Sequence, residues 1–275
     1  MAVCLVYFNP AKSKRLLMNY FYAREKIKMA GIPNYTMELY YDTPEIKKAF
    51  HVKSETYMFH KERLCRLLEK EVSWFYSKVV FLDADIVFTD PNWYSEVSKL
   101  LDTHDVVHPF KTAMWSDITY KDSLQQRTTV LTAERGGRYD PTLHPGFAWA
   151  FRRSWYRKVG FFDYGITGSG DTLSAAAWLD LKFPKGYLQP ALKPAFEDFC
   201  ALPRPRITNA SGTIVHLCHG SKHNRKYVER HAVLKGIEDI RKVIRISENG
   251  TFELTDPNLN HKLKLYFIGR DDDGF

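Results

Sequence analysis

The chain has 275 residues and a formal net charge of +8, with 44% hydrophobic and 15% aromatic residues. This composition excludes an intrinsically disordered chain, and the length suits one large domain or two small ones. No window approaches the roughly 20 apolar residues that a membrane-spanning helix needs, so no membrane association is expected. The basic excess favours a polyanionic partner, although a nucleotide-diphosphate ligand would account for part of it.

The cysteines and the first residues of the chain indicate the cellular compartment in which the protein is expected. The four cysteines form no C-x-x-C pair, which is typical of reduced, mostly buried thiols in a cytosolic protein. Residues 1–8 lack a basic leader and have the pattern of a core strand. We therefore expect a cytoplasmic protein.

The first third of the chain alternates apolar strands with amphipathic helices. Strand, helix, strand, helix and strand in succession indicate βαβ units in a parallel sheet with right-handed crossovers. No G-x-G-x-x-G and no P-loop pattern is present, which excludes the usual dinucleotide and P-loop phosphate sites. The predicted elements are a strand over 3–8, a helix over 13–30, a strand over 35–41, a helix over 58–73 and a strand over 78–82.

The remainder is less regular but continues the same fold class. We expect an α/β protein with a mixed, mainly parallel sheet flanked by helices, divided into a domain over 1–227 and a packed helical or strand extension over 228–275. The predicted segments are a helix over 91–101, a strand over 105–109, a polar loop over 111–142, a strand over 147–152, a helix over 172–181, a proline-rich irregular stretch over 184–206, a last core strand over 213–217 and a basic helix over 227–244.

Two carboxylates follow the apolar run Val79–Leu82 at a spacing of i, i+2, namely Asp83 and Asp85. Burying both would cost several kcal/mol each unless a cation compensates. A strand that ends here projects them from its carboxyl edge, where open α/β sheets bind ligands. Oxygen ligands at this spacing suit a hard divalent cation such as Mg or Mn.

A second polar cluster follows the strand over 213–217. His216 and His219 come first, and a cationic run containing Lys222 and Arg225 follows. Neutral imidazole is a common metal ligand and could complete a site begun by Asp85, while the cations could neutralise a diphosphate. A solvated basic turn with a packed histidine, or a zinc site that includes Cys218, are the alternatives.

A third candidate is Asp171, which follows the glycine-rich segment 165–170 and precedes a helical pattern. Asp is a good helix N-cap, so a purely structural role is one interpretation. The functional interpretation places this carboxylate at an acceptor pocket, where it could accept a proton from a hydroxyl.

Together these residues resemble the GT-A glycosyltransferases over about residues 3–227. The parts occur in the family's order: the N-terminal strand, Asp83-Ala84-Asp85, the segment 146–152, the loop 168–171 and a late strand that ends in histidine. With the tail 265–273, the chain is similar to small soluble glycosyltransferases of phages and large DNA viruses.

The resemblance implies roles for single residues. Asp83 and Asp85 would hold a divalent metal on a nucleotide-sugar diphosphate, with His219 or His216 as a further ligand. Asp171 would be the general base if the reaction inverts the anomeric configuration, and would only position the acceptor if it retains it.

The expected acceptor is a hydroxylated base in DNA, such as a hydroxymethyl base. The net charge of +8 and two basic segments, 152–158 and 222–230, motivate that expectation. A glycan or lipid-linked sugar is the alternative acceptor. A metal-dependent nuclease or phosphotransferase, and a non-catalytic DNA-binding protein, are the alternatives from other classes.

Overall fold

A computed structural model describes residues 1–220, 229–270 and 272–274. Within these residues, the centre of the protein is a seven-stranded sheet with the strand order β10-β6-β9-β4-β1-β2-β3. All neighbouring strands are parallel except β9, which runs antiparallel to both β4 and β6. The strands are β1 (Ala2–Phe8), β2 (Asn34–Tyr40), β3 (Phe50–Lys53), β4 (Lys78–Asp83), β6 (Val106–His108), β9 (Ala148–Arg152) and β10 (Ile207–Asn209). The predicted mixed, mainly parallel sheet is confirmed.

The sheet is buried on both faces. In β1, Cys4 and Val6 pack into one hydrophobic cluster, while Val3 and Leu5 pack into the other. This alternation follows from the two-residue period of a strand, and it explains why β1 and the interior of β4, Val79–Leu82, are apolar.

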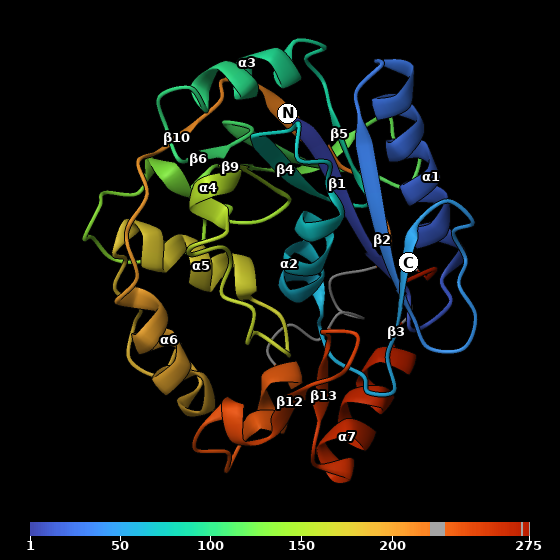
Figure 1. Cartoon of the computed structure of the whole chain (residues 1–275), viewed down its shortest axis with the longest axis vertical. Coiled ribbons are helices and arrows are strands. Elements are labelled where there is room, and N and C mark those ends of the chain that lie inside the picture. The colour runs from blue at the N-terminus through green and yellow to red at the C-terminus, as the bar shows by residue number, and fades with distance from the viewer. Residues whose placement is uncertain (221–228, 271, 275) are drawn as a thin grey trace.

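Helices cover the two faces, as Figure 1 shows. One face carries α2 (Lys61–Glu71), α5 (Gly170–Leu179) and α6 (Lys193–Cys200), and the other carries α1 (Lys14–Met29) and α3 (Trp93–Leu100). The short α4 (Arg153–Tyr156) follows β9 directly. The first helix starts where predicted, because the Ser13 hydroxyl accepts a hydrogen bond from the backbone N–H of Leu16.

A smaller sheet lies beyond the carboxyl end of β4. It has the order β5-β11-β7-β8, with β11 antiparallel to β5 and parallel to β7. Its strands are β5 (Ile86–Phe88), β7 (Thr112–Ser116), β8 (Ser123–Thr128) and β11 (Thr213–His216). A hairpin of β12 (Ile244–Ile246) and β13 (Phe252–Leu254) leads to α7 (Pro257–Ile268), and residues of both join the buried cluster that β1 and α2 share.

Several sequence predictions are wrong in detail. Residues 111–142 hold β7 and β8, whose polar outward side chains hide the strand pattern, and 184–206 contain α6. The strand at 213–216 belongs to the smaller sheet, and β12 and β13 follow it. In place of a basic helix over 227–244, the described residues form 3-10 turns at Glu229–Leu234 and Ile240–Lys242. The division at residue 227 stays a prediction, because 221–228 lie outside the described residues.

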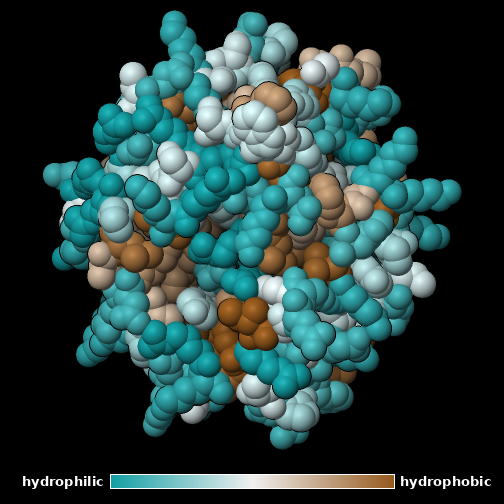
Figure 2. Space-filling model, in the orientation of Figure 1, coloured by the Kyte–Doolittle hydropathy of each residue, from teal (hydrophilic) through white to brown (hydrophobic). Residues whose placement is uncertain are grey.

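The face drawn in Figure 2 is mostly hydrophilic, and its hydrophobic residues gather near the middle and lower part. Among the described residues, no helix has the length and apolar character to cross a membrane.

Candidate active site

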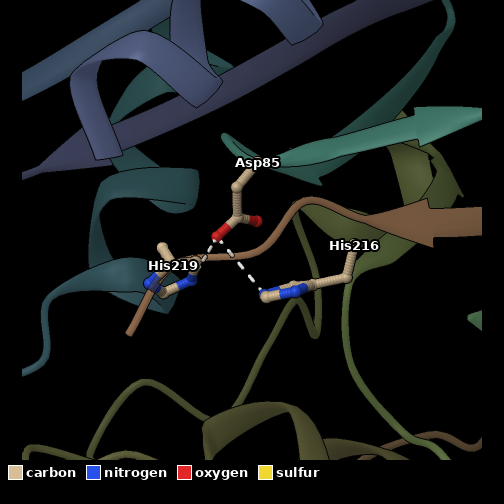
Figure 3. Close-up of side chains that lie close together, drawn as sticks. All are labelled: Asp85, His216 and His219. Carbon is tan, nitrogen blue, oxygen red and sulfur yellow. Dashed lines mark ion pairs between the residues drawn. The ribbon is translucent and has the colours of Figure 1, made fainter. Parts of the chain in front are cut away.

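The pairing of β5 with β11 brings Asp85 and the two histidines together (Figure 3). Asp85 lies in the turn between β4 and β5, and Ile86 is paired with His216 across the ladder. The backbone N–H of Leu217 donates to the Asp85 carbonyl at 2.8 Å. This register fixes His216 and His219 beside a carboxylate that is distant in the sequence.

The three side chains form a compact cluster. Nε2 of His219 lies 2.7 Å, and Nε2 of His216 3.4 Å, from Oδ2 of Asp85. Both histidines are buried, and the His216 ring stacks on Phe147. Burial alone would raise the pKa of Asp85, but the two imidazoles outweigh it and hold that pKa well below its usual range.

The donor set of this cluster fits a divalent metal. One ligand atom from each of Asp85, His216 and His219 lies within 4.8 Å of the others. Oδ1 of Asp85 is buried and has no hydrogen-bond partner, which is costly unless a cation or water satisfies it. Among the described residues the cluster does not include Cys218, so the zinc alternative with a cysteine ligand is not supported.

The two aspartates of the D-x-D segment have different partners. Oδ1 of Asp83 lies 2.6 Å from Nζ of Lys61, whereas Asp85 faces the histidines. Burial raises the pKa of Asp83 to about 6 against the lowering effect of Lys61. The structure thus brings Asp85, His216 and His219 together, and sets Asp83 beside them in contact with a lysine.

Lys61 is a site residue that sequence reasoning missed. It is the first residue of α2 and also lies 3.7 Å from Oδ2 of Asp171, so it links two of the candidate carboxylates. Burial would lower the pKa of Lys61, but Asp83 and Asp171 more than compensate and raise it. A single lysine in a helical pattern carries no signal by itself, because only the tertiary structure shows what it faces.

Glu62 was also missed. Burial raises the pKa of its carboxyl to about 8, and a side chain at Gly170 would collide with that carboxyl group. The glycine before Asp171 therefore allows Glu62 to pack against the start of α5.

A cavity of about 820 Å³ is lined by all the candidate residues described above: Asp85, His216, His219, Asp83, Lys61, Glu62 and Asp171. Its walls include the cations Lys61, Arg127, Arg230 and Arg270. The predicted diphosphate ligands Lys222 and Arg225 lie outside the described residues. The cavity wall also includes Tyr139, Tyr187, Trp115, Phe147, Asp83, Asp85, Asp171, His144, His216, His219 and Asp272.

Asp171 is not the N-cap of α5. Ser169, with φ of +72°, takes that position, and Asp171 is the second helical residue. Its Oδ1 accepts from the Thr172 N–H at 2.7 Å. A Cβ added to Gly146 would lie 2.5 Å from Oδ2 of Asp171, so the chain approaches this carboxylate closely. Asp171 therefore stands at the cavity wall with one oxygen turned toward Lys61 and Gly146.

The basic segment 152–158 is only partly exposed to solvent. Arg153 is buried, and its guanidinium binds Glu69 and the backbone carbonyls of residues 69, 72, 73 and 76. Arg152 is half-buried and donates to the Leu101 carbonyl, while Arg157 and Lys158 are exposed. Arg153 therefore has a structural role, and it cannot contact a nucleic acid.

No protein-family model and no curated protein sequence matches the chain. Solved structures do resemble it. A mutant of the Drosophila β1,4-galactosyltransferase 7, solved with manganese, UDP-Gal and xylobiose, is 12% identical over 95% of this chain and 98% of its own, with a TM-score of 0.45. A mannosyltransferase from Pyrobaculum calidifontis, in complex with GDP-Man and Mn²⁺, is 13% identical over 84% of this chain and 61% of its own, with a TM-score of 0.48. Sequence identities and TM-scores this low do not by themselves establish an activity for this protein.

Proposed function

We propose that this protein is a metal-dependent glycosyltransferase of the GT-A type, which moves a sugar from a nucleotide-diphosphate sugar to an acceptor hydroxyl. The observation that carries the proposal is the Asp85–His216–His219 cluster, in which both histidines are buried and Oδ1 of Asp85 has no hydrogen-bond partner. All three residues line a large cavity that Asp171 also lines. The order of the same residues along the chain, which resembles the GT-A family, supports it.

The metal end of the cavity suits the diphosphate of the donor. Asp85, His216 and His219 would hold Mn or Mg, whereas Asp83, two residues before Asp85, pairs with Lys61 and is not one of the three clustered donors. When bound, the ion supplies positive charge that stabilises the departing diphosphate. Lys61, Arg127 and Arg270 line the same cavity and add positive charge for the phosphate oxygens.

The other carboxylate suits the acceptor. Asp171 is at the cavity wall and is separated from Asp83 by Lys61. An acceptor hydroxyl hydrogen-bonded to Asp171 would give up its proton to that carboxylate as it attacks the anomeric carbon, if the configuration is inverted. In a retaining reaction Asp171 would only orient the hydroxyl.

For the acceptor itself, the finer proposal is a hydroxylated base in DNA. It rests on the net charge of +8 and on the exposed Arg157 and Lys158; Arg153 no longer contributes to it. A glycan acceptor leaves this charge without a role. Retention of duplex DNA that falls steeply with salt would favour the DNA acceptor, and no retention at low salt would rule it out.

The test is a panel of UDP- and GDP-sugars incubated with the protein and Mn, with hydroxymethylated DNA or oligosaccharides as acceptors. Mass spectrometry of the nucleosides and glycans identifies the product. Donor hydrolysis that the wild type catalyses and Asp85→Asn does not would support the transferase. Cleavage of DNA under the same conditions, without use of any donor, would instead establish the nuclease alternative.

A further inference from the structure

Asp272 reaches the candidate metal centre, although it lies more than 50 residues from His219 in the sequence. Oδ1 of Asp272 lies 3.5 Å from Nδ1 of His219, and both side chains are buried. The other ring nitrogen of His219 faces Asp85 at 2.7 Å. His219 is therefore held between a carboxylate of the metal cluster and a carboxylate of the tail.

From this geometry we propose that Asp272 is a positioning residue for metal binding, acting through His219. The inference rests on the proposed function, because it takes Asp85, His216 and His219 as the ligands. A carboxylate behind a ligating histidine holds the proton on the far ring nitrogen, which keeps the near nitrogen free for the metal and fixes the ring orientation. In this site the far nitrogen is Nδ1 and the near one is Nε2.

Asp272 is itself held in place. Nη2 of Arg270 donates to Oδ1 of Asp272 at 2.9 Å. The Arg270 guanidinium lies over the rings of Phe59, which lines the cavity, and of Phe267, a buried residue of α7. The carboxylate thus has a fixed orientation toward His219, which a positioning residue requires.

The neighbouring aspartate anchors the same segment to the other side of the site. Asp273 accepts hydrogen bonds from the Ser13 hydroxyl at 2.7 Å and from the backbone N–H groups of Lys14 and Arg15 at 3.0 and 2.8 Å. These N–H groups belong to the first turn of α1, where no carbonyl of the helix can accept from them and a carboxylate is favourable. The tail is therefore tied both to α1 and to the metal cluster.

The experiment measures Mn²⁺ affinity directly, by calorimetry or electron paramagnetic resonance, on the full chain and its variants. We expect Asp272→Ala to raise the Kd about 10- to 100-fold, the usual effect of losing an outer carboxylate. Asp272→Asn should cause a smaller rise, because its amide oxygen still accepts from Nδ1. The matched control is Asp163→Asn, which removes a buried carboxylate bound by Arg63 and Arg66 away from the cavity wall.

A double-mutant cycle separates positioning from general destabilisation. If Asp272 acts through His219, Asp272→Ala should have no further effect on Mn²⁺ affinity in a His219→Ala background. An unchanged Kd in Asp272→Ala, or an equal rise in Asp163→Asn, would overturn the inference and leave the proposed function standing. Normal metal binding without use of any nucleotide sugar would overturn the transferase instead. A wild type that binds no divalent metal would overturn both.

Discussion

Nε2 of His219 lies 2.7 Å from Oδ2 of Asp85, which is the shortest link between the two halves of the candidate metal centre. The contact depends on the β5–β11 ladder, since each residue lies just beyond the paired strands. It joins the acidic turn after β4 to the end of the smaller sheet, and the predictions about metal binding depend on it.

Removing either member of this pair should abolish tight metal binding. We expect His219→Ala and Asp85→Asn each to weaken Mn²⁺ affinity by at least about 100-fold, because a direct ligand contributes no less than an outer one. Isothermal titration with Mn²⁺ checks this. The control is His104→Ala, an imidazole outside the cluster. Full Mn²⁺ affinity in both site variants would contradict the assignment.

We expect Lys61 to contribute to the reaction of the nucleotide-sugar donor as well as to the stability of the fold. In Lys61→Met, Asp83 and Asp171 lose the cation between them, and the diphosphate loses a charged partner. We expect kcat/KM for the nucleotide sugar to fall about 100-fold or more, by analogy with loss of one stabilising donor in an active site. Steady-state donor hydrolysis measures it, and Lys53→Met, an exposed lysine paired with Glu55, is the control. Equal kinetics in the two variants would remove Lys61 from the site.

The close approach of Gly146 to Asp171 gives a test that separates the acceptor side from the metal side. A Cβ in Gly146→Ala would lie 2.5 Å from Oδ2 of Asp171 and must displace it. A displacement of about 1 Å can reduce a rate about 100-fold, so transfer should fall while Mn²⁺ affinity is retained. Gly212→Ala is the matched control, because the nearest atom to its new Cβ is 3.9 Å away. Unchanged transfer in Gly146→Ala would argue against a role for Asp171.

The buried His108 predicts a loss of stability in mild acid. Its ring stacks on Trp149, and burial lowers its pKa to about 3, against about 6.5 in an unfolded chain. Between these two pKa values, the His108 imidazole is neutral in the folded state and protonated in the unfolded state. The contribution of His108 to stability is complete above about pH 6.5 and is lost as the pH falls toward about 3, at up to about 1.4 kcal/mol per pH unit.

Denaturant unfolding at several pH values between 7 and 4 measures this slope. In His108→Gln the dependence of the unfolding free energy on pH should be shallower by up to one proton, even if the variant is less stable at pH 7. Replacement of the exposed His261 controls for the loss of a surface imidazole. A slope as steep in His108→Gln as in the wild type would show that other groups cause the acid sensitivity.

Two arginines that share Glu69 should differ sharply in their effect on stability. The Arg153 side chain is 5% exposed and Arg157 58%, and both contact Oε1 of Glu69. Arg153→Met removes the buried cation beside Glu69 and leaves several backbone carbonyls unpaired, and it should cost about 3–5 kcal/mol, whereas Arg157→Ala should cost less than about 1 kcal/mol. Chemical denaturation of both variants checks the contrast, and similar costs would refute the structural role of Arg153.

Residue patterns along the chain are sufficient to predict the fold class, because continuous apolar runs between amphipathic helices require a sheet buried on both faces. They also predict Asp83 and Asp85 at the edge of that sheet, since two carboxylates inside a buried strand would cost several kcal/mol each. Periodicity failed at β7 and β8, where a strand in the smaller sheet has polar outward residues, and over residues 229–242, where short turns replace a helix.

Which side chains meet depends on how the strands and helices are arranged in three dimensions. The β5–β11 register selects Asp85 and the two histidines, and a salt bridge with Lys61 draws Asp83 toward Asp171. The tail aspartates reach the site in the same way, through contacts with His219 and the start of α1. Such contacts join residues that are far apart in the chain. Local residue patterns do not indicate which distant residues come into contact, because they reflect only neighbours in the sequence.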